Sequence, residues 1–142
     1  MNTADLPRTL AHLYSELANG TGAGKEGFVL NSGDVGLHAS LDRLSAEEAS
    51  RSANDGATIA AHAQHVRYGL SLMNRWAREG GNPFADATWE AAWETGTVDA
   101  ATWDEIRRGL RREADEWLKV LGTAREVQDI ELTGMVASIA HL

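Results

Sequence analysis

Apolar residues recur every three or four positions along most of this chain, which is the spacing of an amphipathic α-helix. The first such segment covers residues 4–18, and its apolar positions are Leu6, Leu10, Leu13 and Leu17. Gly20 marks its end, because glycine commonly follows the last turn of a helix. A Gly-rich connection covers residues 19–33, and the pattern then predicts a helix over residues 32–44.

The two longest predicted helices lie further along the chain. One covers residues 58–79, with Thr58 as its N-cap and Gly80 and Gly81 as its stop. Its predicted core face consists of Ile59, Ala63, Val66, Leu70, Met73 and Trp76. The other begins at Asp99 or Thr102 and ends at Leu121, before Gly122. Its predicted core face consists of Trp103, Ile106, Leu110, Ala114, Trp117 and Leu121.

Three shorter helical segments complete the predicted set. Ser45 and Glu48 have the spacing of a capping box, which predicts one short turn. Trp89 and Trp93 are four residues apart, which predicts a short amphipathic turn. A last helix is predicted to begin near Thr133, with Val136, Ile139 and Ala140 facing inward. The chain ends inside this last helix, and no alternation of strand type reaches a useful length, so the predicted fold class is all-α.

Composition narrows the possible classes of protein. The 142 residues fit a single domain, 1–142, and the absence of cysteine excludes disulfides and thiolate chemistry. The net charge of −8 argues against a nucleic-acid partner, because such proteins need a basic surface. The first residues lack the pattern of a signal peptide, and no apolar run approaches the ~20 residues of a membrane helix. We therefore expect a cytoplasmic protein with no membrane or nucleic-acid partner.

Two motifs favour ordinary surface roles over binding. The segment from Gly20 to Lys25 is similar to a phosphate-binding loop, but it is one residue too short and Glu26 replaces the Ser or Thr. We interpret it as a flexible loop. The second long helix carries a cluster of four arginines, in which Asp104 stands four residues before Arg108 and Glu116 stands four residues after Arg112; such pairs are typical of a solvated helix face. These arginines are Arg107, Arg108, Arg111 and Arg112.

The histidines are the candidate functional residues. His62 and His65 are three apart on one side of a helix, within or beside its apolar stripe, and His141 faces the apolar side of the last helix. A lone inward histidine is usually a hydrogen-bonded core residue. Inward histidines on two helices can instead share a metal ion, and neutral imidazole suits several divalent metals. The spacing alone leaves both interpretations open, and it likewise leaves Trp89 and Trp93 as either packing residues or the cover of a pocket.

The order of these features resembles the DinB/YfiT-like superfamily of helical proteins. The resemblance extends over nearly all of the chain after Gly33, and it lies in residues 35–45, 58–68, 82–86, Trp89, Trp93 and 136–142. It implies a four-helix bundle with a long crossover connection, here preceded by an extra N-terminal helix. It also implies a divalent metal held by one histidine of the second bundle helix and two histidines of the last helix.

The resemblance assigns the metal ligands residue by residue. His65 matches the first ligand, with His62 as a less favoured substitute, and His141 matches the first histidine of the last-helix pair. The second histidine of that pair would stand four residues later, where this sequence has no residue. We therefore expect zinc, nickel or iron to be held weakly.

Two functions from different classes follow from the resemblance. The first is a metal-dependent hydrolase or low-molecular-weight-thiol S-transferase, acting on a small-molecule substrate or thiol. In it Trp89 and Trp93 would shape the mouth of the pocket, and Glu90 and Glu94 are the nearest candidates for a general base. The alternative is a non-catalytic, stress-related or small-molecule-binding bundle with structural histidines. In both cases we expect a homodimer, because the short last helix leaves neighbouring apolar surface uncovered.

Overall fold

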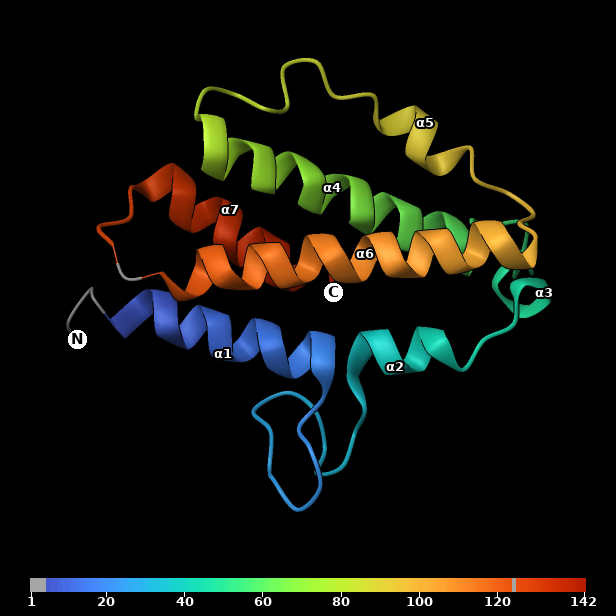
Figure 1. The fold of residues 1–142 in the computed structure, drawn as a ribbon, viewed down its shortest axis with the longest axis horizontal. Coiled ribbons are helices and arrows are strands. Elements are labelled where there is room, and N and C mark those ends of the chain that lie inside the picture. The colour runs from blue at the N-terminus through green and yellow to red at the C-terminus, as the bar shows by residue number, and fades with distance from the viewer. Residues whose placement is uncertain (1–4, 124) are drawn as a thin grey trace. The chain divides into compact units, whose positions relative to one another are not determined.

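The protein is all-helical in the residues that its structure describes. The computed structural model describes residues 5–123 and 125–142, and no strand occurs among them. Their helices, in chain order, are α1 (Leu6–Asn19), α2 (Gly36–Asp42), α3 (Ala46–Ala49), α4 (Ile59–Glu79), α5 (Trp89–Trp93), α6 (Ala100–Gly122) and α7 (Asp129–Ala140) (Figure 1). No helix in this part of the chain combines the length and the apolar character needed to cross a membrane.

The chain forms two compact units, and each is described by itself. The first comprises the residues up to Ser40 together with Asp115–Leu142, so it holds α1, the Gly-rich loop, the end of α6 and α7. The second comprises Leu41–Ala114, so it holds α3, α4, α5 and most of α6. The division falls inside α2 and α6, which belong in part to each unit.

In the first unit, α7 packs on α1 and is tied to the end of α6. The buried indole of Trp117 on α6 donates its Nε1–H to Ser138 Oγ on α7 at 2.8 Å, and that hydroxyl donates to the Met135 carbonyl at 2.7 Å. A buried indole N–H needs such an acceptor, because leaving it unpaired is costly. This chain of hydrogen bonds therefore fixes the face that α7 presents to the rest of its unit.

In the second unit, α6 is linked to α4 and to the segment before α3 by polar side chains. Trp103, buried on α6, donates its indole N–H to the Leu44 carbonyl at 2.8 Å. Asn74, fully buried on α4, donates to the backbone carbonyl of Glu113 at 3.0 Å and to its carboxylate at 2.8 Å. These contacts position α4, the helix that carries the candidate histidines.

Local sequence signals explain where several helices begin and end. The capping box at α3 is confirmed, since Ser45 Oγ accepts from Glu48 N at 3.2 Å and Ser45 N donates to the Glu48 carboxylate at 2.9 Å. Thr58 caps α4 through Ala61 N at 3.0 Å, as predicted. The expected ion pair of Arg108 is also present, at 2.9 Å from Asp104.

Arg107 and Arg111 depart from the expected solvated helix face. Both reach the Asp42 carboxylate, at 2.9 and 2.7 Å respectively, so these two arginines link α6 to the end of α2 within the second unit. The i,i+4 pattern predicted the pair of Arg108 with Asp104. It predicted neither the i,i+3 pair of Arg107 with Asp104, at 3.2 Å, nor the Asp42 partner from another element.

The predicted boundaries of two helices were wrong, and so was the predicted inward face of the last helix. The helix predicted over residues 32–44 covers only Gly36–Asp42, and the last helix begins at Asp129 rather than near Thr133. Val136 is 50% exposed and Ala140 is also exposed, although both were predicted to face inward. The buried residues of α7 are Met135 and Ser138. Because α7 is apolar on nearly every side, its pattern does not identify one face.

Candidate functional site

His65 lies in a cluster of aromatic side chains formed by α4 and α5. Its ring stacks on the indole of Trp93, with centroids 4.2 Å apart and planes 23° apart, and it lies 5.2 Å from the ring of Trp89 at an angle of 45°. The two tryptophans are four residues apart on one side of α5, and α5 packs against α4. The indoles of Trp89 and Trp93 therefore fix the plane of the His65 imidazole.

His62 joins the same cluster one turn earlier on α4. Its ring meets Trp93 edge-on, with centroids 5.0 Å apart and planes at 87°. His62 is an exposed residue, whereas His65 is half-buried. His62 and His65, predicted to share one side of the helix, therefore both contact the indole of Trp93, and His65 is the more buried of the two.

Tyr68 and Phe84 complete the cluster around Trp89. Tyr68 meets Trp89 at 79° with 5.3 Å between centroids, and Phe84 lies nearly parallel to Trp89 at 6.2 Å. The Tyr68 hydroxyl accepts a hydrogen bond from Thr88 N at 2.9 Å, which ties the segment before α5 to α4. Hydrogen bonds from the side chain and backbone of Thr88 lower the pKa of Tyr68 below its ordinary value, because they stabilise the phenolate.

An ion pair holds the connection between α4 and α5. The Arg75 guanidinium lies 2.8 Å from the Asp86 carboxylate and also donates to the Pro83 carbonyl. The hydrogen bond and the positive charge of Arg75 lower the pKa of Asp86. The loop that leads to Trp89 is therefore fastened at both of its ends, by Arg75 and by Tyr68.

His141 is the C-cap residue of α7, in the other unit, and it is exposed. Its Nδ1 lies 2.8 Å from the Ala137 carbonyl oxygen. A carbonyl only accepts, so this contact assigns the proton to Nδ1 and leaves the lone pair of the neutral ring on Nε2. A backbone carbonyl at one ring nitrogen is the usual partner of a histidine that binds metal through the other.

No complete metal site is formed within residues 5–123 and 125–142. These residues contain no group of three or more histidine, aspartate and glutamate side chains placed to hold one ion. The general-base candidates Glu90 and Glu94 are both exposed, on and just after α5. Chemically, the cluster offers an oriented imidazole at His65, a second at His62, and a partly exposed aromatic surface at Trp93 and Phe84.

Comparisons with protein-family models, with curated proteins and with solved structures found no match to this chain.

A buried carboxylate, that of Glu16, was not predicted from the sequence. Glu16 on α1 is buried, and its carboxylate accepts three successive backbone N–H groups, from Phe28 at 2.9 Å and from Val29 and Leu30 at 2.7 Å each. Gly27 is required beside it, since a Cβ there would lie 2.4 Å from Glu16 Oε1. The only sequence signal is an acidic residue among apolar positions of an amphipathic helix, followed by a Gly-rich segment.

This carboxylate organises the Gly-rich loop between α1 and α2. Thr21 N donates to the Asp34 carbonyl at 3.1 Å, and Gly33 N donates to Thr21 Oγ1 at 3.0 Å, so the two ends of the loop are joined. Compact loops with adjacent ends and internal packing are often functional. The structure thus describes a folded loop where the sequence suggested a flexible connection.

Proposed function

We propose that this protein is a DinB/YfiT-like four-helix bundle with a long crossover connection and an extra N-terminal helix, and that it binds a divalent metal ion. The support is the order of its motifs together with its all-helical character. The proposed ligands are His65 and His141, with His62 as the substitute for His65. The proposed metals are zinc, nickel and iron, which imidazole suits.

The observation that carries this proposal is the orientation of the His65 ring by Trp89 and Trp93. A ligand whose ring plane is fixed in advance loses less freedom when a metal binds. His141 supports the proposal independently, because the Ala137 carbonyl fixes its tautomer with the lone pair on Nε2. Two imidazoles are fewer than the three protein ligands of a catalytic metal site, so the proposed binding is weak.

The proposed activity is that of a metal-dependent hydrolase or a low-molecular-weight-thiol S-transferase in the cytoplasm. A bound divalent metal in such enzymes activates water or a thiol at an open coordination position. The part of this chemistry assigned to the chain is the orientation of His65 and the shaping of the approach by Trp89 and Trp93.

Metal content tests the metal proposal. The protein, purified without a histidine tag, is equilibrated with each metal and measured by mass spectrometry. We expect His65→Ala and His141→Ala each to lower the bound metal, and His12→Ala, which removes an exposed imidazole from α1, to leave it unchanged. Equal metal content in the protein with and without His65→Ala would contradict the proposal. Turnover of a thiol conjugate with and without metal tests the proposed activity.

A second candidate function is a non-catalytic, small-molecule-binding protein whose histidines are structural. The stacking of His65 on Trp93 favours it, because such packing is a sufficient reason for a histidine at this position. Under this alternative, His65→Ala lowers thermal stability without changing metal content.

We also propose that the protein forms a homodimer. The support is the apolar surface of α7, where Ile130 is 65% exposed and Val136 is 50% exposed. Exposed apolar residues on one helix are a common basis of self-association. Light scattering over a range of concentrations, with Val136→Glu as the variant expected to be monomeric, tests this part of the proposal.

A further inference from the structure

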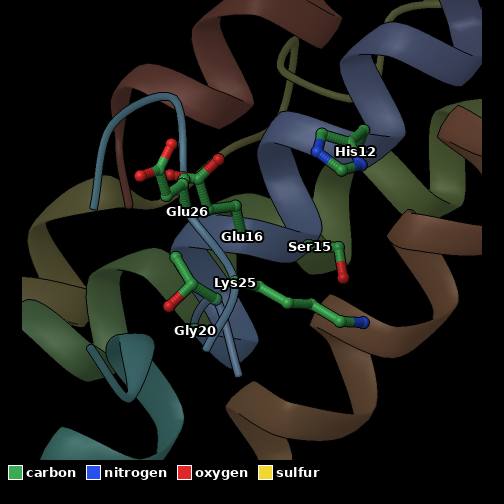
Figure 2. A pocket seen from close by; sticks show the side chains of 8 residues that line it. His12, Ser15, Glu16, Gly20, Lys25 and Glu26 are labelled. Atoms are coloured by element: carbon green, nitrogen blue, oxygen red, sulfur yellow. The ribbon is translucent and has the colours of Figure 1, made fainter. Parts of the chain in front are cut away.

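The first unit contains a cavity with charged side chains in its lining that the proposed metal site does not use. Its volume is about 230 Å³, and it lies between α1 and the Gly-rich loop. The side chains that line it include His12, Ser15 and Glu16 from α1 and Lys25 and Glu26 from the loop (Figure 2). It is smaller than the roughly 300–1,000 Å³ of pockets for drug-sized ligands, so a matching ligand has few atoms.

Opposite charges are separated within this cavity. Figure 2 shows the carboxylates of Glu16 and Glu26 on one side of the view, while the Lys25 side chain extends to the other side, where the Ser15 hydroxyl is drawn. His12 stands one turn before Glu16 on α1 and packs edge-on against Phe28, whose N–H donates to Glu16 Oε2, so it lies beside the Glu16 carboxylate. The cavity thus has an acidic end and an end with hydrogen-bond donors.

The Glu16 carboxylate, at the acidic end, can accept a further hydrogen bond in addition to the three from the loop. A carboxylate has about four lone-pair positions, and the loop uses two of them on Glu16 Oε1 and one on Oε2. The remaining position on Oε2 suits a further donor. The three backbone N–H groups, that of Leu30 most strongly, also hold the pKa of Glu16 below its ordinary value, so its carboxylate keeps its charge at neutral pH.

The donor end is arranged by α1 itself. Asn19 Nδ2 donates to Ser15 Oγ at 3.3 Å, so that oxygen acts as an acceptor toward Asn19 and its proton can be directed to another group. Lys25 supplies the positive charge that attracts an anion to this end.

We propose that this cavity binds a small zwitterion that carries an ammonium group and a carboxylate group, as an amino acid does. The ammonium group is placed at Glu26 and Glu16 Oε2, and the carboxylate group is placed at Lys25 and Ser15. A simple anion fits less well, because Glu16 and Glu26 repel it, and a simple cation meets Lys25. Only a ligand with both charges satisfies both ends.

Amide chemical-shift titrations of the full chain test this proposal. The zwitterionic probes are glycine, β-alanine and 4-aminobutyrate, and the single-charge probes are acetate and methylammonium. We expect at least one zwitterion to give saturating shifts at the amides of Ser15, Lys25 and Glu26, with each single-charge probe binding at least about tenfold more weakly.

Two matched pairs of variants locate the binding. Lys25→Gln and Glu26→Gln each weaken binding of the zwitterion by about tenfold or more, whereas Lys119→Gln and Glu126→Gln, which neutralise exposed residues elsewhere in the same unit, leave it unchanged. Unchanged amide spectra away from the loop show that each variant is folded. The proposal is overturned if no zwitterion saturates, if acetate or methylammonium binds as tightly, or if Lys25→Gln has no effect.

Discussion

The imidazole of His65 and the indole of Trp93 stack with their ring planes 23° apart and their centroids separated by 4.2 Å. This contact joins α4 to α5, a helix of only five residues that contributes Ala92 to the buried set. So short a helix has little stability of its own, because helix formation is costly to nucleate. Its position therefore depends on the aromatic side chains that pack around His65.

A double-mutant cycle measures this dependence. We expect His65→Ala and Trp93→Ala to be coupled by about 1 kcal/mol in the free energy of unfolding, since stacked aromatic pairs contribute roughly that much beyond their buried area. Urea denaturation of both single variants and the double variant gives the coupling. The control pairs Trp93→Ala with Glu47→Ala, an exposed residue of α3 that binds Arg51, and should be additive. A coupling near zero for His65 and Trp93 would show that the stack is not stabilising.

Glu16→Gln should loosen the Gly-rich loop in a pH-dependent way. The backbone N–H groups of Leu30, Phe28 and Val29 lower the pKa of Glu16 below its ordinary value of 4.5, so the folded state binds this proton less readily than the unfolded state. The stabilisation is therefore complete above about pH 4.5 and is lost as the pH falls through the lower pKa of the folded state.

The measurement is the difference in unfolding free energy between the natural protein and Glu16→Gln at several pH values. It should be largest at neutral pH and shrink in acid, and amide hydrogen exchange at residues 28–30 should be faster in the variant. Glu26→Gln is the control, because Glu26 is exposed and makes none of these three hydrogen bonds. A difference that does not change with pH would contradict this account of Glu16.

Gly20→Ala should destabilise the protein more than Gly24→Ala. Both glycines have positive φ, +86° and +70°, and Gly20 also has ψ 175°, a backbone region essentially confined to glycine, where strain costs about 1–3 kcal/mol. A Cβ at Gly20 would in addition lie 2.3 Å from the Asp34 carbonyl oxygen, whereas a Cβ at Gly24 meets nothing within 4 Å. We therefore expect Gly20→Ala to lose a further ~1–3 kcal/mol, measured by thermal or urea unfolding. Equal losses would mean that the backbone at Asp34 moves aside freely.

Ser138→Ala should destabilise the first unit by about 1–3 kcal/mol, because it leaves the buried indole N–H of Trp117 without its acceptor. The matched control is Ser32→Ala, which removes an exposed hydroxyl in the same unit. Calorimetric unfolding provides the comparison, and near-ultraviolet circular dichroism reports on the environment of Trp117. If Ser138→Ala were neutral, the Trp117 N–H would have another acceptor, and the position of α7 would depend on packing alone.

The sequence identified the helices that have one clear apolar face. Trp103 and Trp117 are both core residues of α6, as their spacing predicted, because seven-residue multiples return to the same face of a helix. Val136 was predicted to be buried but is exposed, because α7 has apolar residues around most of its circumference and its pattern does not mark one face. A pattern predicts burial only where polar residues mark the opposite face.

The candidate site was predictable only in part. The sequence placed His62 and His65 together and indicated that Trp89 and Trp93 share a face, but nothing in the spacing predicted that these two pairs meet. Glu16 was missed altogether, because its partners are backbone N–H groups of a loop that begins several residues later. Every residue type except proline has a backbone N–H group, so a contact to such a group gives no signal in the sequence.

The close approach of Gly20 and Gly36 has a consequence for how this protein can change. A Cβ at Gly36 would lie 2.3 Å from Gly20 N, so the fifteen residues between these glycines leave and re-enter the helical framework at almost the same point. A segment attached in this way can vary in length and composition while α1 and α2 keep their positions, because the ends to be bridged are already adjacent. The segment between Gly20 and Gly36 can therefore change independently of the helices. A new recognition surface can evolve on this segment while the helices keep their packing.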